Sequence, residues 1–384
     1  PDLAESITRC TRHRLLARKA GEKAAILLKN ADHLLPLDIN KIKSLAVIGP
    51  NAADIHLGGY NDEPRVGIDL LYGIQEFVGG KIKVEYAEGC RITEGYASWF
   101  ADEVVQTDPV NNKKLIAEAV RVAQNVDVVI LCVGDNEQTC REAWKTDHLG
   151  DRASLEMVGE QEELIHAIAG TGKPVIMVMN HGRPIALTSV LDSVHAILDI
   201  WYLGEETGRV VADILFGNVN PGGKLPITYP RSVGHLPVFY NKKPSANRGY
   251  LFEDNQPLFP FGFGLSYTSF QYSNLRLSSN TGAPGTRVMV MVDITNTGKR
   301  DGEEVVQLYI HDIVASVTRP VTELRDFKRI HLQAGECKTV TFDIPPEKLA
   351  LLNENWKRVV EPGQFEMRVG GNSVDVLKAV YTVS

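Results

Sequence analysis

The sequence predicts a layered α/β sandwich with a mostly parallel sheet, followed by an all-β sandwich. Between residues 44 and 228, apolar runs alternate with helical patterns of about a dozen residues, which is typical of βαβ units and of a mostly parallel sheet. From residue 267 onward, apolar residues recur at every second position, and no helical pattern interrupts them. A chain of 384 residues is long enough for two or three domains with their own cores.

Each expected element of the α/β part has its own pattern. The run at 127–133 is almost entirely apolar, as expected of a strand that is buried on both faces. The expected strands are residues 44–49, 81–86, 127–133, 174–180 and 194–202. The expected helices are residues 68–78, 113–123, 155–169 and 205–216.

The α/β domain is expected over residues 31–228, with three further segments around it. Residues 1–30 begin with an amphipathic helix whose apolar face has no local partner, so we expect an entry segment from a missing upstream domain. Residues 229–266 are rich in Gly, Pro and aromatic residues, which predicts a strap that anchors one domain on another; ligand stacking is the alternative. Short alternating strands at 267–384 indicate a fibronectin type III-like or immunoglobulin-like sandwich.

Composition and motifs exclude several function classes. The formal net charge of -7 and the pI near 5.9 are opposite to the basic face that a nucleic-acid partner requires. No apolar stretch approaches the roughly 20 residues of a membrane-spanning helix. The turn at residues 49–53 lacks both glycine-rich nucleotide-binding patterns, so no cofactor is expected. The five scattered cysteines form no zinc spacing, and the His and acidic residues suggest no metal site either.

The most informative segment is the charged loop at residues 141–152, which follows the buried strand. Open α/β sheets place their ligands at the carboxyl ends of the strands. Glu142 lies in this loop close to Trp144, and partial removal from water beside an indole favours the protonated carboxyl group that a general acid needs. Glu137, which is closer to the strand end, is the second choice for the acid.

The loop also allows other interpretations. Asp147, Asp151 and Arg152 could form a solvated ion-pair group that only shapes the loop. Cys140, two residues from Glu142, could be a thiol nucleophile, although the sequence offers no assured His partner. No convincing second carboxylate accompanies Glu142, so the chain carries one half of a catalytic site under the catalytic interpretation.

Several long motifs occur in order along nearly the whole chain. They are LLKN (residues 27–30), LLPL (34–37), VIGPNA (47–52), NHGRP (180–184), NPGGKLP (220–226) and PFGFGLSY (260–267). Together they resemble glycoside hydrolase family 3, in its β-glucosidase and β-xylosidase group. Larger members of that family place a TIM-like barrel first, then an α/β sandwich domain and often a fibronectin type III-like domain. The resemblance implies that this chain is the second and third of these domains, without the barrel.

The resemblance also implies roles for single residues. In the family, the nucleophilic Asp lies on the barrel and the acid/base Glu comes from a loop of the sandwich domain, which Glu142 matches; Glu137 stays the second choice. Residues 57–60 resemble a family loop that presents an aromatic ring to the sugar, so Tyr60 is expected to stack on a glycosyl ring or to be a structural aromatic. Trp144, beside the acid, is a further candidate for substrate binding.

These expectations combine into one function. The chain is expected to be the acid/base half of a retaining, exo-acting β-glycosidase that hydrolyses terminal β-D-glucosyl or β-D-xylosyl residues. Its expected partners are a β-linked oligosaccharide or glucoside and an N-terminal TIM-like barrel domain or chain, and alone it should be catalytically silent. The alternative is a non-catalytic carbohydrate-binding or scaffolding module. Family members of this architecture are commonly exported, which makes a periplasmic or secreted location an expectation.

Overall fold

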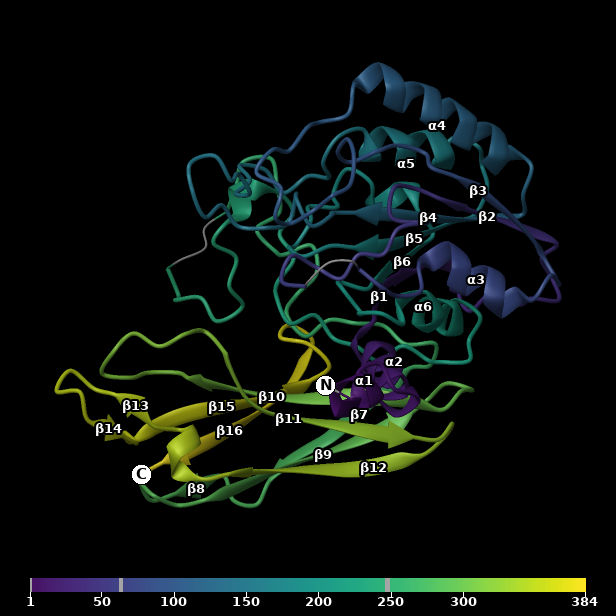
Figure 1. The fold of residues 1–384 in the computed structure, drawn as a ribbon. Coiled ribbons are helices and arrows are strands. Elements are labelled where there is room, and N and C mark those ends of the chain that lie inside the picture. Colours follow the sequence, from purple (N-terminus) through teal and green to yellow (C-terminus); the bar gives the residue numbers. More distant parts are fainter. Residues whose placement is uncertain (1, 62–64, 246–248) are drawn as a thin grey trace. The chain divides into compact units, whose positions relative to one another are not determined.

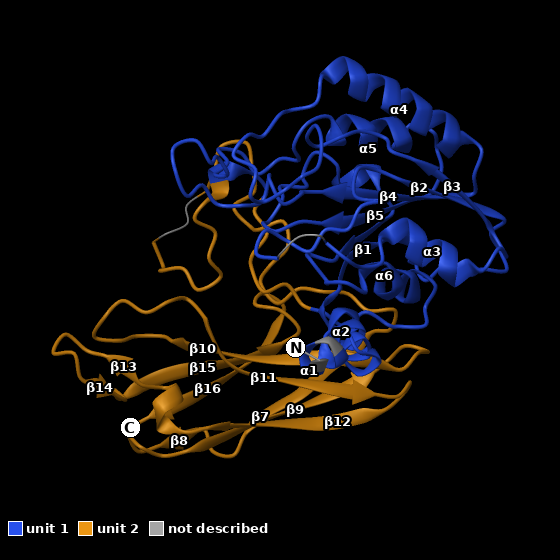
Figure 2. Ribbon diagram, viewed as in Figure 1, with its two compact units in different colours: residues 1–223, 231–234 blue, residues 224–230, 235–384 orange. Residues whose placement is uncertain are grey.

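The computed structural model describes residues 2–61, 65–245 and 249–384 (Figure 1). The chain divides into two compact units, each of which is described by itself (Figure 2). The first unit comprises residues 1–223 and 231–234, and the second comprises residues 224–230 and 235–384. Within the described ranges, no helix is both long and apolar enough to cross a membrane.

A six-stranded sheet forms the centre of the first unit. Its strands are β1 (Ile26–Asn30), β2 (Ser44–Ile48), β3 (Lys83–Ala87), β4 (Val128–Gly134), β5 (Val175–Asn180) and β6 (Ala196–Asp199). The spatial order is β1-β6-β5-β4-β2-β3, and every neighbouring pair is parallel except β1 with β6. Every residue of β4 and β5 is buried, as expected for central strands that are covered on both faces. The predicted mostly parallel α/β fold is thus confirmed.

Helices cover both faces of this sheet. The helices of the first unit are α1 (Asp2–Ile7), α2 (Thr11–Ala24), α3 (Leu70–Val78), α4 (Pro109–Gln124), α5 (Gln161–Ala169) and α6 (Thr207–Leu215). The pair α4 and α5 lies on one face, and α3 and α6 lie on the other (Figure 1). Single 3-10 turns occur at η1 (Ala31–His33), η2 (Leu191–Ser193), η3 (Val233–His235) and η4 (Pro346–Lys348).

Two parts of the first unit differ from the sequence-based expectation. The helix expected from residue 155 begins only at Gln161, because Gly159 has a φ of 67° and interrupts the helical path. The amphipathic segment at the start forms two helices, separated near Arg9 at a φ of 55°. It is followed by strand β1, which the sequence analysis did not predict.

The packing of α3 on α6 depends on two glycines. A Cβ atom at Gly73 would lie 2.2 Å from the carbonyl carbon of Gly208, and one at Gly208 would lie 1.9 Å from the carbonyl oxygen of Asp69. Both distances are far below van der Waals contact, so only glycine permits this close approach of the two helices.

The second unit is a sandwich of strands that are antiparallel except for the parallel pair β8 and β16. Its strands are β7 (Phe270–Leu277), β8 (Thr281–Gly282), β9 (Val288–Asn296), β10 (Gly302–Asp312), β11 (Glu323–Leu332), β12 (Cys337–Ile344), β13 (Leu351–Leu352), β14 (Arg358–Val359), β15 (Gly363–Gly370) and β16 (Val376–Val383). One sheet has the order β11-β10-β15-β16-β8 and the other β12-β9-β7, while β13 and β14 form a small hairpin. In β9, buried and half-buried residues alternate strictly, and the buried apolar ones belong to the core. The predicted fibronectin type III-like sandwich is confirmed.

The aromatic residues of the strap pack within the second unit. Tyr229 forms a backbone bridge with Phe259: its N–H donates to the carbonyl oxygen of Phe259 at 2.9 Å, and its carbonyl oxygen accepts from the N–H of Leu258 at 2.9 Å. Tyr240 stacks on Phe261 with 4.2 Å between ring centroids, and both rings contact Tyr309 of β10 edge-on. These rings therefore hold the strap against the sandwich.

We expect Gly73→Ala to lower the free energy of unfolding by about 3 kcal/mol, because the new methyl group meets backbone atoms that cannot rotate away. The matched control is Gly170→Ala, whose Cβ would have only ordinary contacts of 3.4 Å. Urea unfolding of both variants tests this. Equal stability of the two variants would show that α3 and α6 can separate at no cost.

Candidate functional site

Polar groups from three neighbouring strands meet at the carboxyl edge of the first unit's sheet. Gly134, the last residue of β4, donates its N–H to the Oε1 atom of Gln161 at 2.8 Å. Asn51, which follows β2, donates from Nδ2 to the carbonyl oxygens of Asp135 at 3.1 Å and Asn180 at 3.2 Å. The turns that leave the sheet are therefore tied together at the edge where α/β folds place their ligands.

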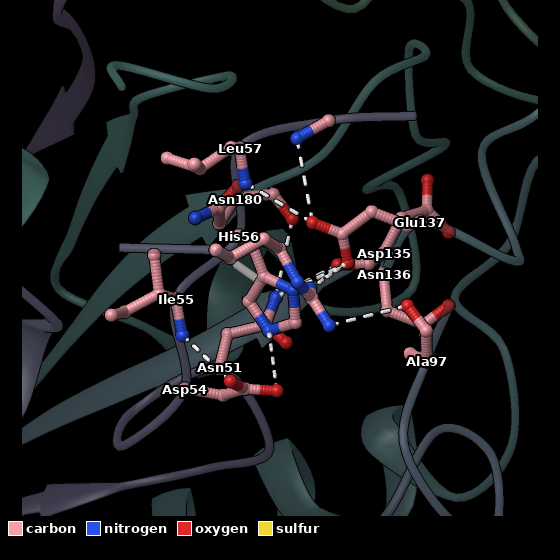
Figure 3. Close-up of polar contacts among 12 residues, drawn as sticks. Asn51, Asp54, Ile55, His56, Leu57, Ala97, Asp135, Asn136, Glu137 and Asn180 are labelled. Atoms are coloured by element: carbon pink, nitrogen blue, oxygen red, sulfur yellow. Dashed lines mark hydrogen bonds and ion pairs between the residues drawn. The ribbon is translucent and has the colours of Figure 1, made fainter. Parts of the chain in front are cut away.

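Glu137 is the buried centre of a hydrogen-bond network (Figure 3). Its side chain is 3% exposed, accepts from Nδ1 of His56 at 2.9 Å, and forms an ion pair with Arg65. The backbone N–H groups of Leu57 and Gly58 donate to its other oxygen at 3.1 and 3.4 Å. Burial raises the pKa of Glu137, but His56 and Arg65 outweigh burial and lower the pKa to about 2. Because His56 and Arg65 hold the Glu137 carboxylate in its ionised form, Glu137 is a poor proton donor, and this environment disfavours the second-choice acid.

Glu142 has the opposite environment, because its side chain is exposed. Among the described residues, its carboxylate has no hydrogen-bond or ion-pair partner. Trp144 does not shield it as expected, because the Trp144 ring packs against Trp99 at 5.3 Å and His148 at 5.2 Å and remains 66% exposed. Glu142 is therefore a solvated carboxylate that a substrate can reach.

Arg141 supports the backbone of the loop that carries Glu142. The Arg141 side chain is buried and donates to the carbonyl oxygens of Leu149 at 2.7 Å, Trp99 at 2.8 Å and Asp102 at 3.3 Å. Arg183 in turn donates to the carbonyl oxygen of Arg141 at 2.9 Å. Since these acceptors come from separate segments, the backbone of Glu142 has a rigid support while its carboxylate stays free.

The two candidate sugar-binding aromatics meet in one cluster around Trp99. Tyr60 lies 5.8 Å and Trp144 5.3 Å from Trp99 between ring centroids, and Phe100 and His148 complete the cluster. Tyr60 is 85% exposed, so its ring is available to a ligand. Trp99 was not predicted as a site residue from the sequence, because its only local signal is the adjacent aromatic pair at 99–100 in a segment without periodicity.

The other charged residues of the loop have structural partners. Arg152 pairs with the buried Asp135 at 2.9 Å, and Ala143 donates its backbone N–H to Asp151 at 3.1 Å. Lys145 and His148 both contact Asp102, at 3.0 and 2.9 Å. The loop is thus shaped by specific ion pairs, and Glu142 is excluded from them.

The NHGRP motif has a structural explanation in His181. Its Nδ1 atom lies 2.7 Å from the carbonyl oxygen of Arg183, and its Nε2 atom lies 3.0 Å from Asp199. Burial lowers the pKa of His181, but the adjacent Asp199 carboxylate more than compensates, so the pKa is raised overall. Because both nitrogens face acceptors, His181 is a buried donor that joins β5 to β6.

Cys140 is unsuited to act as a nucleophile. Its Sγ atom lies 2.9 Å from the hydroxyl oxygen of Tyr202, and burial raises the pKa of the thiol to about 11. A thiol with this pKa is not a thiolate at neutral pH. Among the residues that the structure describes, no group of three or more His, Cys, Asp or Glu side chains is arranged to hold a metal ion.

Family models and curated relatives match both units. Residues 25–267 match the glycosyl hydrolase family 3 C-terminal domain, and residues 304–373 match the fibronectin type III-like domain. A β-xylosidase from Formosa agariphila is 44% identical over 381 residues, which cover 96% of this chain and 50% of that protein. A periplasmic β-glucosidase from Salmonella typhimurium is 39% identical, over 95% of this chain and 49% of its own length.

Solved structures show the same similarity. A β-glucosidase from Erythrobacter marinus has a TM-score of 0.97 and 43% identity, with 100% of this chain and 52% of that chain covered. A β-glucosidase from Listeria innocua in complex with isofagomine has a TM-score of 0.85 and 32% identity, with 100% and 51% covered. The chain spans about half the length of the curated relatives that it matches. With a family model over residues 25–267 and a 44% identical relative over 96% of its length, the chain belongs to glycoside hydrolase family 3.

Proposed function

We propose that this chain is the acid/base half of a retaining β-glycosidase that removes terminal β-D-glucosyl or β-D-xylosyl residues. The observation that carries the proposal is Glu142, a freely exposed carboxylate on a loop that Arg141 holds rigid at the ligand edge of the sheet. The proposal is supported by relatives that are named β-glucosidase and β-xylosidase.

Retaining hydrolysis requires a second carboxylate, which we place on an N-terminal barrel. In this reaction class, two carboxyl groups about 5–5.5 Å apart flank the glycosidic bond. The nucleophile attacks the anomeric carbon while Glu142 protonates the leaving oxygen, so the bond to the aglycone breaks as the bond to the enzyme forms. Glu142 then removes a proton from the water that displaces the enzyme carboxylate. The relatives are about twice as long as this chain, which leaves room for such a domain.

The aromatic cluster has exposed rings that could bind the aglycone, which is the part of the substrate that departs first. Tyr60 and Trp144 expose their rings in the same cluster, and Trp144 lies two residues from Glu142. Aromatic faces carry negative potential and attract the C–H groups of a sugar ring. We therefore assign Tyr60, Trp99 and Trp144 to the subsite that holds the aglycone sugar.

We expect Glu142→Ala, in the full-length protein that contains this chain, to lose at least 100-fold in kcat on substrates with poor leaving groups, because a positioned general acid contributes about 10²–10⁴-fold. The loss should be smaller for an activated aryl β-glucoside. Added azide should partly restore turnover and yield a β-glycosyl azide, because azide needs no base to attack the glycosyl-enzyme. Unchanged turnover would indicate that the loop has only a structural role and would favour a non-catalytic module.

Matched substitutions of Glu137 and Glu142 by glutamine distinguish a structural role from a catalytic one. The pKa of Glu137 is lowered from 4.5 to about 2, so its stabilising contribution is complete above about pH 4.5 and is lost as the pH falls towards 2. At about 1.4 kcal/mol per unit of pKa, this contribution is on the order of 3 kcal/mol. We expect Glu137→Gln to lower the free energy of unfolding by that amount at pH 7 and by much less at pH 2.5.

The control is Glu142→Gln, which should change stability little at either pH, because the side chain is exposed and unpaired among the described residues. Denaturant unfolding at both pH values gives the comparison. If Glu137→Gln were as stable as the wild type at pH 7 and had lost hydrolysis, the acid/base assignment would move to Glu137.

We expect Trp99→Ala to raise KM for β-linked disaccharides roughly tenfold with little change in kcat, because ring contacts of about 1–1.5 kcal/mol are removed from ground state and transition state alike. The matched control is Trp356→Ala, in which an equally large ring, 84% exposed on the second unit, is removed. Steady-state kinetics of the full-length protein provide the test. An unchanged KM would mean that the cluster only supports the loop.

A further inference from the structure

Residues 149–151, at the far end of the loop that carries Glu142, lie directly against the backbone of Glu142. We call these three residues the closing segment. The side chain of Arg141 donates from Nε to a carbonyl oxygen of this segment at 2.7 Å. Ala143 donates its backbone N–H to Oδ1 of Asp151, the last residue of the segment, at 3.1 Å. The closing segment therefore holds the residues on both sides of Glu142.

Gly150, the middle residue of the closing segment, makes the approach possible. A Cβ atom at Gly150 would lie 2.7 Å from the carbonyl oxygen of Arg141, 2.7 Å from the carbonyl carbon of Glu142 and 2.9 Å from the backbone nitrogen of Ala143. Carbon atoms in contact are about 3.5–4.0 Å apart, so a side chain at this position would displace the peptide between Glu142 and Ala143 by roughly 1 Å. Only glycine permits the observed position of this peptide.

Arg183 holds the two parts of the loop together from another region of the chain. Its Nη2 atom donates to the carbonyl oxygen of Arg141 at 2.9 Å and lies 3.5 Å from the carbonyl oxygen of Gly150. The backbone of Arg183 is itself fixed, because its carbonyl oxygen lies 2.7 Å from Nδ1 of the buried His181. The closing segment therefore cannot move away from Glu142 without loss of the contacts that Arg183 makes.

We propose that Gly150 is a positioning residue for the acid/base carboxylate. By allowing the closing segment to lie against the peptide between Glu142 and Ala143, it sets how far the side chain of Glu142 reaches towards the leaving oxygen. The inference rests on the proposed function, because it concerns the same carboxylate. A displacement of about 1 Å can cost on the order of 100-fold in rate, so a methyl group at residue 150 should change the kinetics.

A displaced general acid has a kinetic signature that a loosened loop lacks. A proton from Glu142 is needed when the leaving oxygen is basic, as in 4-methoxyphenyl β-glucoside, and is hardly needed when the phenol is acidic, as in 2,4-dinitrophenyl β-glucoside. Both aglycones are single substituted rings, so weaker aglycone binding or a loss of folded protein would lower kcat/KM for both substrates. A displaced acid lowers kcat/KM mainly for the first substrate.

The test uses matched variants of the full-length protein that contains this chain. Gly150→Ala adds the methyl group, and Gly170→Ala, whose Cβ would have ordinary contacts of 3.4 Å, is its control. Asp151→Ala removes the acceptor of a loop N–H at an exposed position, so it keeps the proposal testable if Gly150→Ala does not fold. Asp151→Asn retains an acceptor oxygen there. Asp147→Ala, which removes a 77% exposed carboxylate from the same loop, is the second control.

We expect Gly150→Ala to lose roughly tenfold or more in kcat/KM on the methoxyphenyl substrate and less than about threefold on the dinitrophenyl substrate. Asp151→Ala should show the same preference with a loss of roughly fivefold, because the peptide is freed but not pushed aside. Asp151→Asn and the two control variants should stay within about twofold of the wild type on both substrates.

Equal losses on the two substrates, or no loss in Gly150→Ala and Asp151→Ala, would overturn the proposal, because the contacts would then only support the loop. A loss that Asp151→Asn shared with Asp151→Ala would trace the effect to charge and would overturn it as well. Glu142→Ala, measured beside these variants, separates the two proposals. If it lacks the dependence on the leaving group, the proposed function fails together with this inference. If it shows that dependence and Gly150→Ala does not, only this inference fails.

Discussion

The site depends on the burial of one guanidinium group, that of Arg141. Burial lowers the pKa of Arg141, so a charge at this position is stable only if its N–H groups are hydrogen-bonded. The acceptors are backbone carbonyl oxygens near residues 99–102 and at Leu149, which belong to segments about 50 residues apart along the chain. Satisfying this one charge forces the segments together, and the same convergence places Trp99 against Trp144 and leaves Glu142 projecting beside them.

Glu137 and Glu142 are five residues apart, but their different surroundings give the two carboxylates different roles. Glu137 lies where the chain is still against the sheet, and it binds a histidine, an arginine and two backbone N–H groups, so it serves as a permanent anion. Glu142 lies after the chain has turned outward over the buried Arg141, so it has no fixed partner among the described residues. A buried ionised carboxylate organises a loop, whereas an acid/base catalyst must exchange a proton with substrate and water.

The fold could be predicted because the pattern that marks each element lies in neighbouring residues. The geometry of the site, in contrast, depends on contacts between residues that are far apart along the chain. The buried run of β4 and the alternation in β9 follow from neighbouring residues, so both were predicted. Strand β1 was missed because its partner, β6, lies about 170 residues away and its apolar run resembles the end of the preceding helix. The support that Arg141 gives Glu142 and the central place of Trp99 were also beyond the sequence, since no local pattern marks their contacts.

For the proposed enzyme, a rigid loop has a physical advantage. If the nucleophile and the acid/base residue come from different domains, their separation near 5–5.5 Å depends on how those domains pack. Flexibility in the loop of Glu142 would add to any variation in that packing, and a misplacement of about 1 Å can cost 100-fold in rate. Anchoring the backbone through Arg141 and Arg183 confines the remaining freedom to the side chain of Glu142. That freedom is what the residue needs in order to donate a proton to a departing oxygen and then accept one from water.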